Sequence, residues 1–110
     1  MKKYFLLQIL SISFLLANDG ELLFNGNCIT CHNINKDISA PSIKEVQKRY
    51  KKAFEKKEDF INYMSSWVIE PSEERSIMLD KIKKYKLMPL LGYEEVVVRE
   101  IASYIYDTKF

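Results

Sequence analysis

The stretch Cys28-Ile29-Thr30-Cys31-His32 decides how the rest of the chain is interpreted. Its spacing, C-x-x-C-H, is the attachment signature of a c-type haem. Two thiols separated by two residues can both add to the vinyl groups of one porphyrin. His32 is then held beneath the ring, where one nitrogen of a neutral imidazole can bind the iron and the other needs a hydrogen-bond acceptor. The stretch therefore predicts one haem c, covalently attached through Cys28 and Cys31, with His32 as an iron ligand.

Two other interpretations of this stretch compete with haem attachment. The chain has 2 cysteines and 1 histidine in total, whereas a closed structural zinc site takes four ligands, so carboxylates would have to complete it. A thiol–disulfide oxidoreductase using Cys28 and Cys31 would be expected within a thioredoxin-like βαβ pattern, and the sequence shows no such pattern.

The first residues have the pattern of an export signal. Lys2 and Lys3 precede an uncharged, mostly apolar run over residues 4–17. That run is shorter than the roughly 20 residues that span a membrane. We therefore expect residues 1–17 to be a signal peptide, with an uncleaved N-terminal anchor as the alternative, and residues 18–110 to form one domain in the periplasm. Membrane contact is expected only if the N-terminal segment is retained.

The charge balance argues against nucleic acid as a partner. Without Lys2 and Lys3 the 17 basic residues become 15, equal to the 15 acidic ones. An exported chain near neutrality lacks the basic surface of a nucleic-acid-binding protein. A domain this small also has a thin core, which a large apolar haem would extend.

Periodicity predicts an all-helical domain. Only 3 glycines and 3 prolines interrupt the chain, and no alternating strand pattern persists. Ser42-Ile43-Lys44-Glu45 has the form of a capping box. Helices are expected to begin at Asp19 and Ser42, to cover 58–69 up to Pro71, to begin again at Ser72 with Ile77, Met78 and Ile82 on one face, and to run from near Tyr93 through Ile105.

Most of the domain resembles a class I monohaem cytochrome c, most sharply at its two ends, and its helix-rich middle, residues 44–86, is similar to that of the bacterial periplasmic type. Gly20, Phe24 and Cys28 follow one another at four-residue steps, and Ile101-Ala102-Ser103-Tyr104-Ile105 is similar to the family's last helix. The resemblance implies a small cytochrome c-like fold in which the N- and C-terminal helices cross, with further helices around the haem. Gly20 would allow the close crossing, and Phe24 would meet Tyr104.

The second axial ligand is a choice among methionine, lysine and an open site, because there is no second histidine. Met64 and Met78 lie on apolar helical stripes, where methionine usually fills the core. Met88 lies in an expected loop, and Pro89 restricts it to an extended backbone. Met-Pro before the last helix also resembles the family's ligand motif, which implies Met88 as the ligand.

Other site residues follow from the same resemblance. Pro41, nine residues after His32, resembles the proline whose carbonyl accepts the imidazole N–H; the alternative is a loop proline preceding a helix. Trp67, Arg49 or Tyr50 can be proposed as donors to a haem propionate, although packing or surface roles compete for each.

A haem with two protein ligands has no open site for substrate, so the expected function is one-electron transport and not catalysis. The expected partners are redox proteins: a membrane quinol-oxidising complex, a terminal oxidase, or a periplasmic reductase or peroxidase. Lys81, Lys83, Lys84 and Lys86 precede Met88 and are expected to dock acidic partners. A monomer is expected. The alternatives are a fixed cytochrome subunit of a larger complex, a haem sensor or peroxidase with an open sixth site, and the thiol–disulfide oxidoreductase.

Overall fold

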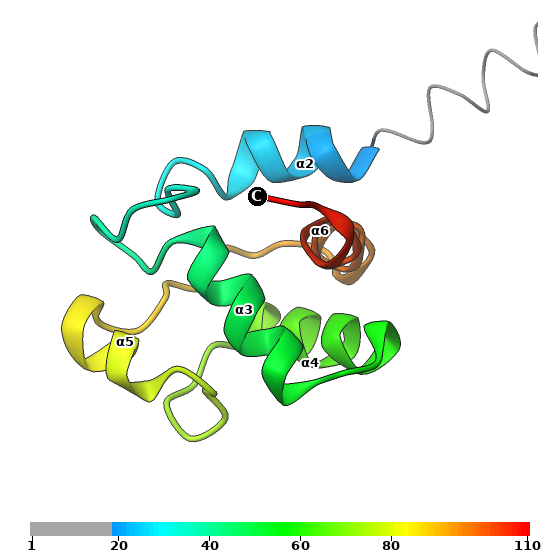
Figure 1. Cartoon of the computed structure of the whole chain (residues 1–110). Helices are drawn as coiled ribbons and strands as arrows, with labels where there is room; N and C mark the ends of the chain where they lie inside the picture. The colour runs from blue at the N-terminus through cyan, green and yellow to red at the C-terminus, as the bar shows by residue number, and fades with distance from the viewer. Residues whose placement is uncertain (1–18) are drawn as a thin grey trace, which may run out of the picture.

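A computed structural model describes residues 19–110, and this part contains five α-helices and no strand. The all-helical fold expected from the sequence is therefore confirmed (Figure 1). The helices are α2 (Asp19–Asn27), α3 (Ile43–Ala53), α4 (Lys57–Ile69), α5 (Leu79–Tyr85) and α6 (Glu95–Asp107). The expected signal peptide, residues 1–17, lies outside the described residues. None of these five helices is both long and apolar enough to cross a membrane.

The N- and C-terminal helices cross at Gly20, as the sequence predicts. Figure 1 shows α2 lying across α6, which is seen nearly end on. A Cβ atom on Gly20 would lie 2.9 Å from Tyr104 Cβ and 3.0 Å from the Glu100 carbonyl oxygen. One turn further along α2, Phe24 is 1% exposed, and its ring centroid lies 5.3 Å from that of Tyr104. Gly20 thus permits the approach and Phe24 fills the space beside it.

We expect Gly20→Ala to destabilise the protein by about 1–3 kcal/mol, because backbone and Cβ atoms of α6 would have to move. This exceeds the gain of roughly 1 kcal/mol that alanine brings to a helix. Gly26, also in α2, is the matched control, since its Cβ would meet nothing within 4 Å. Gly26→Ala should therefore be neutral or slightly stabilising. Denaturant unfolding of both variants checks the opposite signs; equal effects would contradict a tight crossing.

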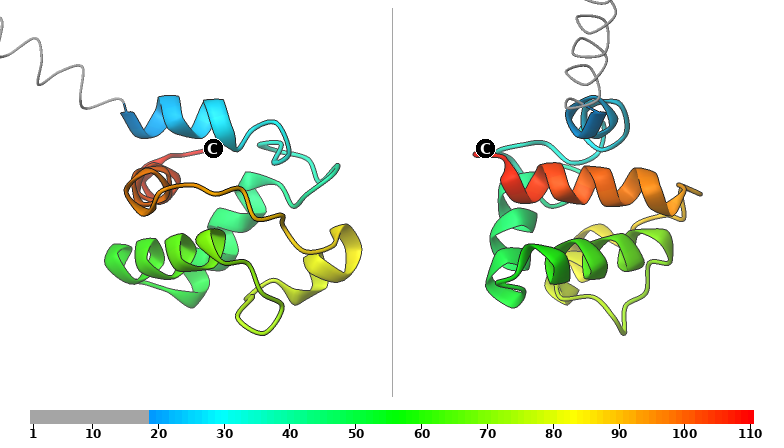
Figure 2. Two further views of the ribbon diagram at one scale, coloured as in Figure 1. Left: turned by 180° about the vertical axis from the view of Figure 1, so that it is seen from behind. Right: turned by 90° about the vertical axis from the view of Figure 1, so that its right-hand side faces the viewer.

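Helices α4 and α6 run antiparallel and form the main layer of the fold. Figure 2 shows them side by side in its right-hand view. Near one end, the Phe60 and Tyr106 rings meet edge to face with centroids 5.1 Å apart. Two residues further along α4, Asn62 Oδ1 accepts a 2.8 Å hydrogen bond from Arg99, which lies about two turns before Tyr106 in α6. This layer gives α2 a fixed surface on which to cross.

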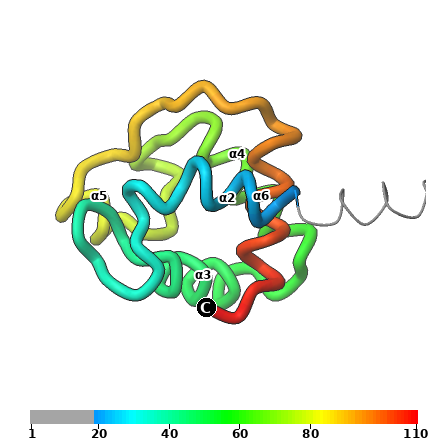
Figure 3. The backbone as a smooth tube through the Cα atoms, turned by 90° about the horizontal axis from the view of Figure 1, so that it is seen from above, coloured from blue at the N-terminus to red at the C-terminus, as the bar shows by residue number. Residues whose placement is uncertain are grey.

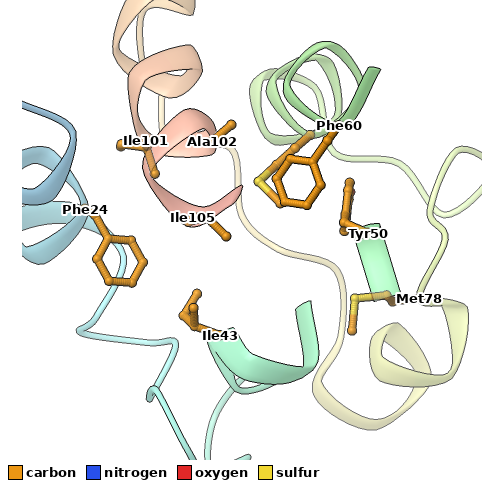
Figure 4. Close-up of a cluster of buried hydrophobic side chains, with 9 residues drawn as sticks. Phe24, Ile43, Tyr50, Phe60, Met78, Ile101, Ala102 and Ile105 are labelled. Atoms are coloured by element: carbon orange, nitrogen blue, oxygen red, sulfur yellow. The ribbon is translucent and has the colours of Figure 1, made fainter. Parts of the chain in front are cut away.

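The core gathers side chains from α2, α3, α4 and α6, together with Met78 just before α5 (Figure 4). Aromatic rings dominate it, and the Tyr50 and Phe60 centroids lie 5.7 Å apart. Two methionines belong to this cluster. Its buried members are Phe24, Ile43, Tyr50, Phe60, Met64, Met78, Ile101, Ala102 and Ile105.

The prediction that a helix begins at Ser72 is wrong about where the helix starts. Residues 73–75 form a turn, and α5 begins only at Leu79. The cause is Arg75, whose guanidinium donates to the carbonyl oxygens of Ser66 and Glu70 at the end of α4. Because those bonds hold Arg75 against the preceding helix, the chain cannot continue into a new helix until it has left that contact.

The segment between α5 and α6 lies apart from α3. Figure 3 shows residues 86–94 on the opposite side of α2 from α3. Figure 2, in its left-hand view, shows the same segment crossing the back of the molecule from α5 to α6. This segment carries Met88, whereas the segment before α3 carries Pro41.

Candidate functional site

The Cys28–His32 stretch continues directly from α2. The Cys28 amide donates to the Phe24 carbonyl at 2.9 Å, and the His32 amide donates to the Cys28 carbonyl at 2.9 Å. Cys28 is half-buried against the core cluster, and Cys31 is exposed. Since Phe24 is packed against Tyr104 of α6, the helix crossing also fixes the position of the two thiols.

The His32 side chain is oriented by Pro41. His32 Nδ1 lies 2.8 Å from the Pro41 carbonyl oxygen. A carbonyl can only accept, so Nδ1 carries the proton and Nε2 is left as the basic nitrogen. The intervening loop is closed by two backbone bonds, from Ile43 to Asn33 at 2.8 Å and from Lys44 to Ile34 at 3.1 Å. The α3 start thus presents Pro41 to the imidazole.

This donor set fits a covalently attached haem. Two cysteines two residues apart are followed at once by a half-buried histidine whose ring orientation and tautomer are fixed. The surrounding wall is apolar, since Cys28 and Ile29 pack against the core cluster. Cys28, Cys31 and His32 would hold the group, and Pro41 would orient the imidazole.

Burial changes the chemistry of the first thiol. Desolvation raises the pKa of Cys28 to about 11, whereas redox-active C-x-x-C thiols have lowered values. Tyr93 is a neighbour that the sequence analysis did not identify. Burial, followed by the nearby Cys28 and Cys31, raises the pKa of its phenol, and its hydroxyl donates to the Asn27 carbonyl at 3.4 Å. The chain just before α6 therefore contacts the end of α2 at the thiol-bearing stretch.

The structure separates the three methionines considered as ligands. Met64 and Met78 are 4% and 7% exposed within the core cluster. Met88 lies outside that cluster, half-buried in the irregular segment after α5. Lys86 begins this segment with a φ of 73°, a conformation that favours glycine and turns the chain sharply out of the helix. Met88 is thus carried by a loop and not by a helix face.

Of the three residues considered as propionate donors, Trp67 and Arg49 already donate hydrogen bonds within the chain, and Tyr50 is buried. The Trp67 indole N–H donates to the Ser72 carbonyl at 2.9 Å. Arg49 donates to Glu45 at 3.0 Å and to both carboxylate oxygens of Asp80 at 2.5 and 2.6 Å. Tyr50 is buried, and burial raises the pKa of its hydroxyl.

The expected capping box at Ser42 is only half formed. Ser42 Oγ accepts from the Glu45 amide at 3.2 Å, as expected. The Ser42 amide, however, donates to Asp37 Oδ1 at 2.8 Å and not to Glu45. Glu45 pairs with Arg49 instead. Asp37, which the sequence analysis did not identify, therefore completes the N-terminus of α3.

Asp37 also joins the His32 loop to α5. Lys81 Nζ lies 2.6 Å from Asp37 Oδ2. Figure 1 shows α5 below the segment that leads into α3. The Lys81 ammonium and the Ser42 amide hold the pKa of Asp37 below its ordinary value, so the carboxylate is ionised at neutral pH.

Comparison with known proteins adds the family. A family model described as Cytochrome c matches residues 17–108. No curated protein and no solved structure matches the chain.

Proposed function

Because the chain belongs to the cytochrome c family, we propose that it is a periplasmic one-electron carrier with one haem c, ligated by His32 and Met88. The proposal includes an export signal over residues 1–17 and a cytochrome domain over 18–110. It takes the protein to be an electron carrier and not an enzyme. The observation that carries it is the His32–Pro41 contact at 2.8 Å beside Cys28 and Cys31.

The chain's own residues supply attachment, orientation and burial. The haem, when bound, supplies one-electron exchange between Fe(II) and Fe(III). Cys28 and Cys31 hold the ring, while Pro41 fixes the imidazole so that little rearranges on oxidation. A Met88 thioether raises the reduction potential relative to a nitrogen ligand. The apolar cluster against which Cys28 and Ile29 pack would keep water away, which further favours the less charged, reduced site.

The visible spectrum of the protein, exported with a haem-maturation system, tests this proposal. A sharp reduced α-band and the weak long-wavelength band of oxidised haem with a sulfur ligand are expected. Haem without the sulfur band would indicate an open sixth site, as in a sensor or peroxidase. Absence of haem would favour the alternative in which Cys28 and Cys31 act as a thiol–disulfide oxidoreductase.

The surface around Met88 has the character of a transient docking site. Lys83, Lys84 and Lys86 are exposed beside the C-terminal end of α5. Three exposed leucines follow on the same segment, and they are Leu87, Leu90 and Leu91. An apolar patch bordered by lysines suits brief association with acidic redox proteins. Within residues 19–110, Lys81 forms an ion pair with Asp37, whereas Lys83, Lys84 and Lys86 form none.

Replacing Lys83, Lys84 and Lys86 by glutamine should slow oxidation by anionic ferricyanide at low salt by roughly threefold to tenfold. The loss of positive charge near the Met88 segment is the reason. At about 1 M salt, where the screening length is about 3 Å, the difference should vanish. Stopped-flow rates measure both.

The matched control replaces Lys44, Lys48 and Lys52, which are exposed on α3, by glutamine. It removes the same charge from another surface and should change the rate less. If the two triple variants behave alike, net charge and not a local surface governs the reaction.

A further inference from the structure

One peptide group links the candidate iron ligand to Asp37. The Pro41 carbonyl oxygen lies 2.8 Å from His32 Nδ1. The Ser42 amide, which lies 2.8 Å from Asp37 Oδ1, is the other end of the same peptide bond. The imidazole N–H, the Pro41–Ser42 peptide and the Asp37 carboxylate therefore form a continuous hydrogen-bonded chain.

The peptide bond can transmit charge along this chain. Its resonance places negative charge on the carbonyl oxygen and positive charge on the N–H. An ionised carboxylate at the N–H end makes a charge-assisted hydrogen bond and favours that polarised form. Cooperative strengthening of roughly 10–30% per bond has been estimated for such chains. The Pro41 oxygen thereby becomes a better acceptor, and the imidazole a more basic ligand.

Lys81 stands at the far end of the chain and opposes the effect. Its ammonium lies 2.6 Å from Asp37 Oδ2, and the Lys81 and Asp37 side chains are only 18% and 25% exposed. Partial burial limits solvent screening of this pair. Lys81 withdraws charge from the carboxylate and ties this arrangement to α5, the helix that leads into the Met88 segment.

We propose that Asp37 is a positioning residue that lowers the reduction potential by acting on His32 through the Pro41–Ser42 peptide, and that Lys81 moderates this effect. The proposal rests on the proposed function, because it requires His32 to bind the haem iron. A more basic imidazole favours the ferric state. Glu45 could by itself accept from the Ser42 amide and cap α3. Asp37 therefore has a second role besides capping this helix.

Asp37→Asn is the direct test, since the amide oxygen can still accept from Ser42 while the charge is gone. The midpoint potential should rise by the equivalent of a three- to tenfold change in the redox equilibrium constant, or about 28–59 mV for one electron. Asp80→Asn is the control, because Asp80 is also paired with a base, Arg49, but reaches no peptide of the loop. Its shift should be less than half as large.

Salt separates the two routes of influence. A through-space effect should shrink at about 1 M salt, whereas transmission through the peptide should persist. In the reduced protein, the Ser42 amide proton should also move upfield in Asp37→Asn and stay in place in Asp80→Asn. Equal, salt-sensitive shifts in the two variants would overturn the proposal, as would a loss of thermal stability in Asp37→Asn without a change of potential.

Lys81→Gln tests the same chain with Asp37 intact, and so decides the matter even if Asp37→Asn does not fold. The potential should fall, by more than in the control Lys83→Gln. Equal shifts would overturn the role of Lys81. If the wild type shows no sulfur-ligated haem, the proposed function has failed; if it does and the Asp37 and Asp80 variants agree, only the present inference has failed.

Discussion

Met88→Ala is expected to leave the haem covalently attached while removing its sulfur ligand. The proposed attachment is through Cys28 and Cys31, which lie on the α2 side of the fold, whereas Met88 lies in the segment after α5. The long-wavelength band of the oxidised protein should disappear. The reduction potential should fall by more than about 59 mV, a tenfold change in the redox equilibrium, because a thioether favours the reduced iron. Spectroscopy and redox titration of the same sample measure both effects.

The two buried methionines provide the controls. Met64→Leu and Met78→Leu change side chains that are 4% and 7% exposed in the core cluster. Swaps of this kind conserve volume and usually cost less than about 1.5 kcal/mol. Both variants should keep the sulfur band with a slightly lower Tm. Survival of the band in Met88→Ala would exclude Met88 as the ligand, and its loss in Met78→Leu at the same time would assign the ligand to Met78.

The helix crossing could be predicted because its signal is local. Gly20 and Phe24 lie one turn apart on α2, and each residue type has a direct steric meaning. The structure supplies the distances: a Cβ on Gly20 would lie 2.9 Å from Tyr104 Cβ, and the ring centroids of Phe24 and Tyr104 are 5.3 Å apart. Sequence patterns similarly predicted the start of α3, and both bounds of α4 and α6, to within two residues.

The start of α5 could not be predicted because a side chain from outside the helix decides it. Ser72-Glu73-Glu74 is a good cap sequence, and Ser72 Oγ does accept from the Arg75 amide at 3.3 Å. The turn nevertheless stops there, since Arg75 binds the last carbonyls of α4 and the Tyr63 hydroxyl donates to the Arg75 carbonyl at 2.5 Å. Propensity contains no information about such contacts.

At the candidate site, the residues with a motif were found from the sequence and those without one were not. His32 and Pro41 were paired by their resemblance to a family pattern, and the structure places their atoms 2.8 Å apart. Asp37 is an acidic loop residue with no local signal. Its ion pair with Lys81, 44 positions away, depends on how α5 lies in the fold. The sequence contained no hint of this role, because the predicted capping box already assigned Glu45 to the Ser42 amide, and only the structure shows Asp37 in that place.

Replacing both Cys28 and Cys31 by alanine is expected to abolish covalent haem and to give the largest loss of stability among the changes considered. The domain has few buried residues for its length, and the cluster that would contact the haem includes Cys28 and Ile29 at its edge. Haem staining after denaturing electrophoresis and intact mass should both show the bare polypeptide. Circular dichroism should show reduced helix content and a lower Tm than the wild type.

Ser39→Ala is a matched control for this double variant. Ser39 Oγ donates to the Cys31 carbonyl at 3.3 Å, so the change perturbs the same loop without removing a thiol. It should retain haem in full. If the double cysteine variant carried covalent haem, another attachment residue would be required and the role given to Cys28 and Cys31 would be wrong.

The pKa of Cys28 also favours haem attachment over thiol–disulfide chemistry. A thiol whose pKa is raised to about 11 is ionised at pH 7 in only about one molecule in ten thousand, and the thiolate is the species that attacks disulfides. An oxidoreductase needs the opposite shift at its attacking cysteine. Burial of Cys28 against an apolar wall is unfavourable for redox exchange but suits a sulfur that becomes a neutral thioether. Haem-free wild-type protein that reversibly forms a Cys28–Cys31 disulfide would contradict this argument directly.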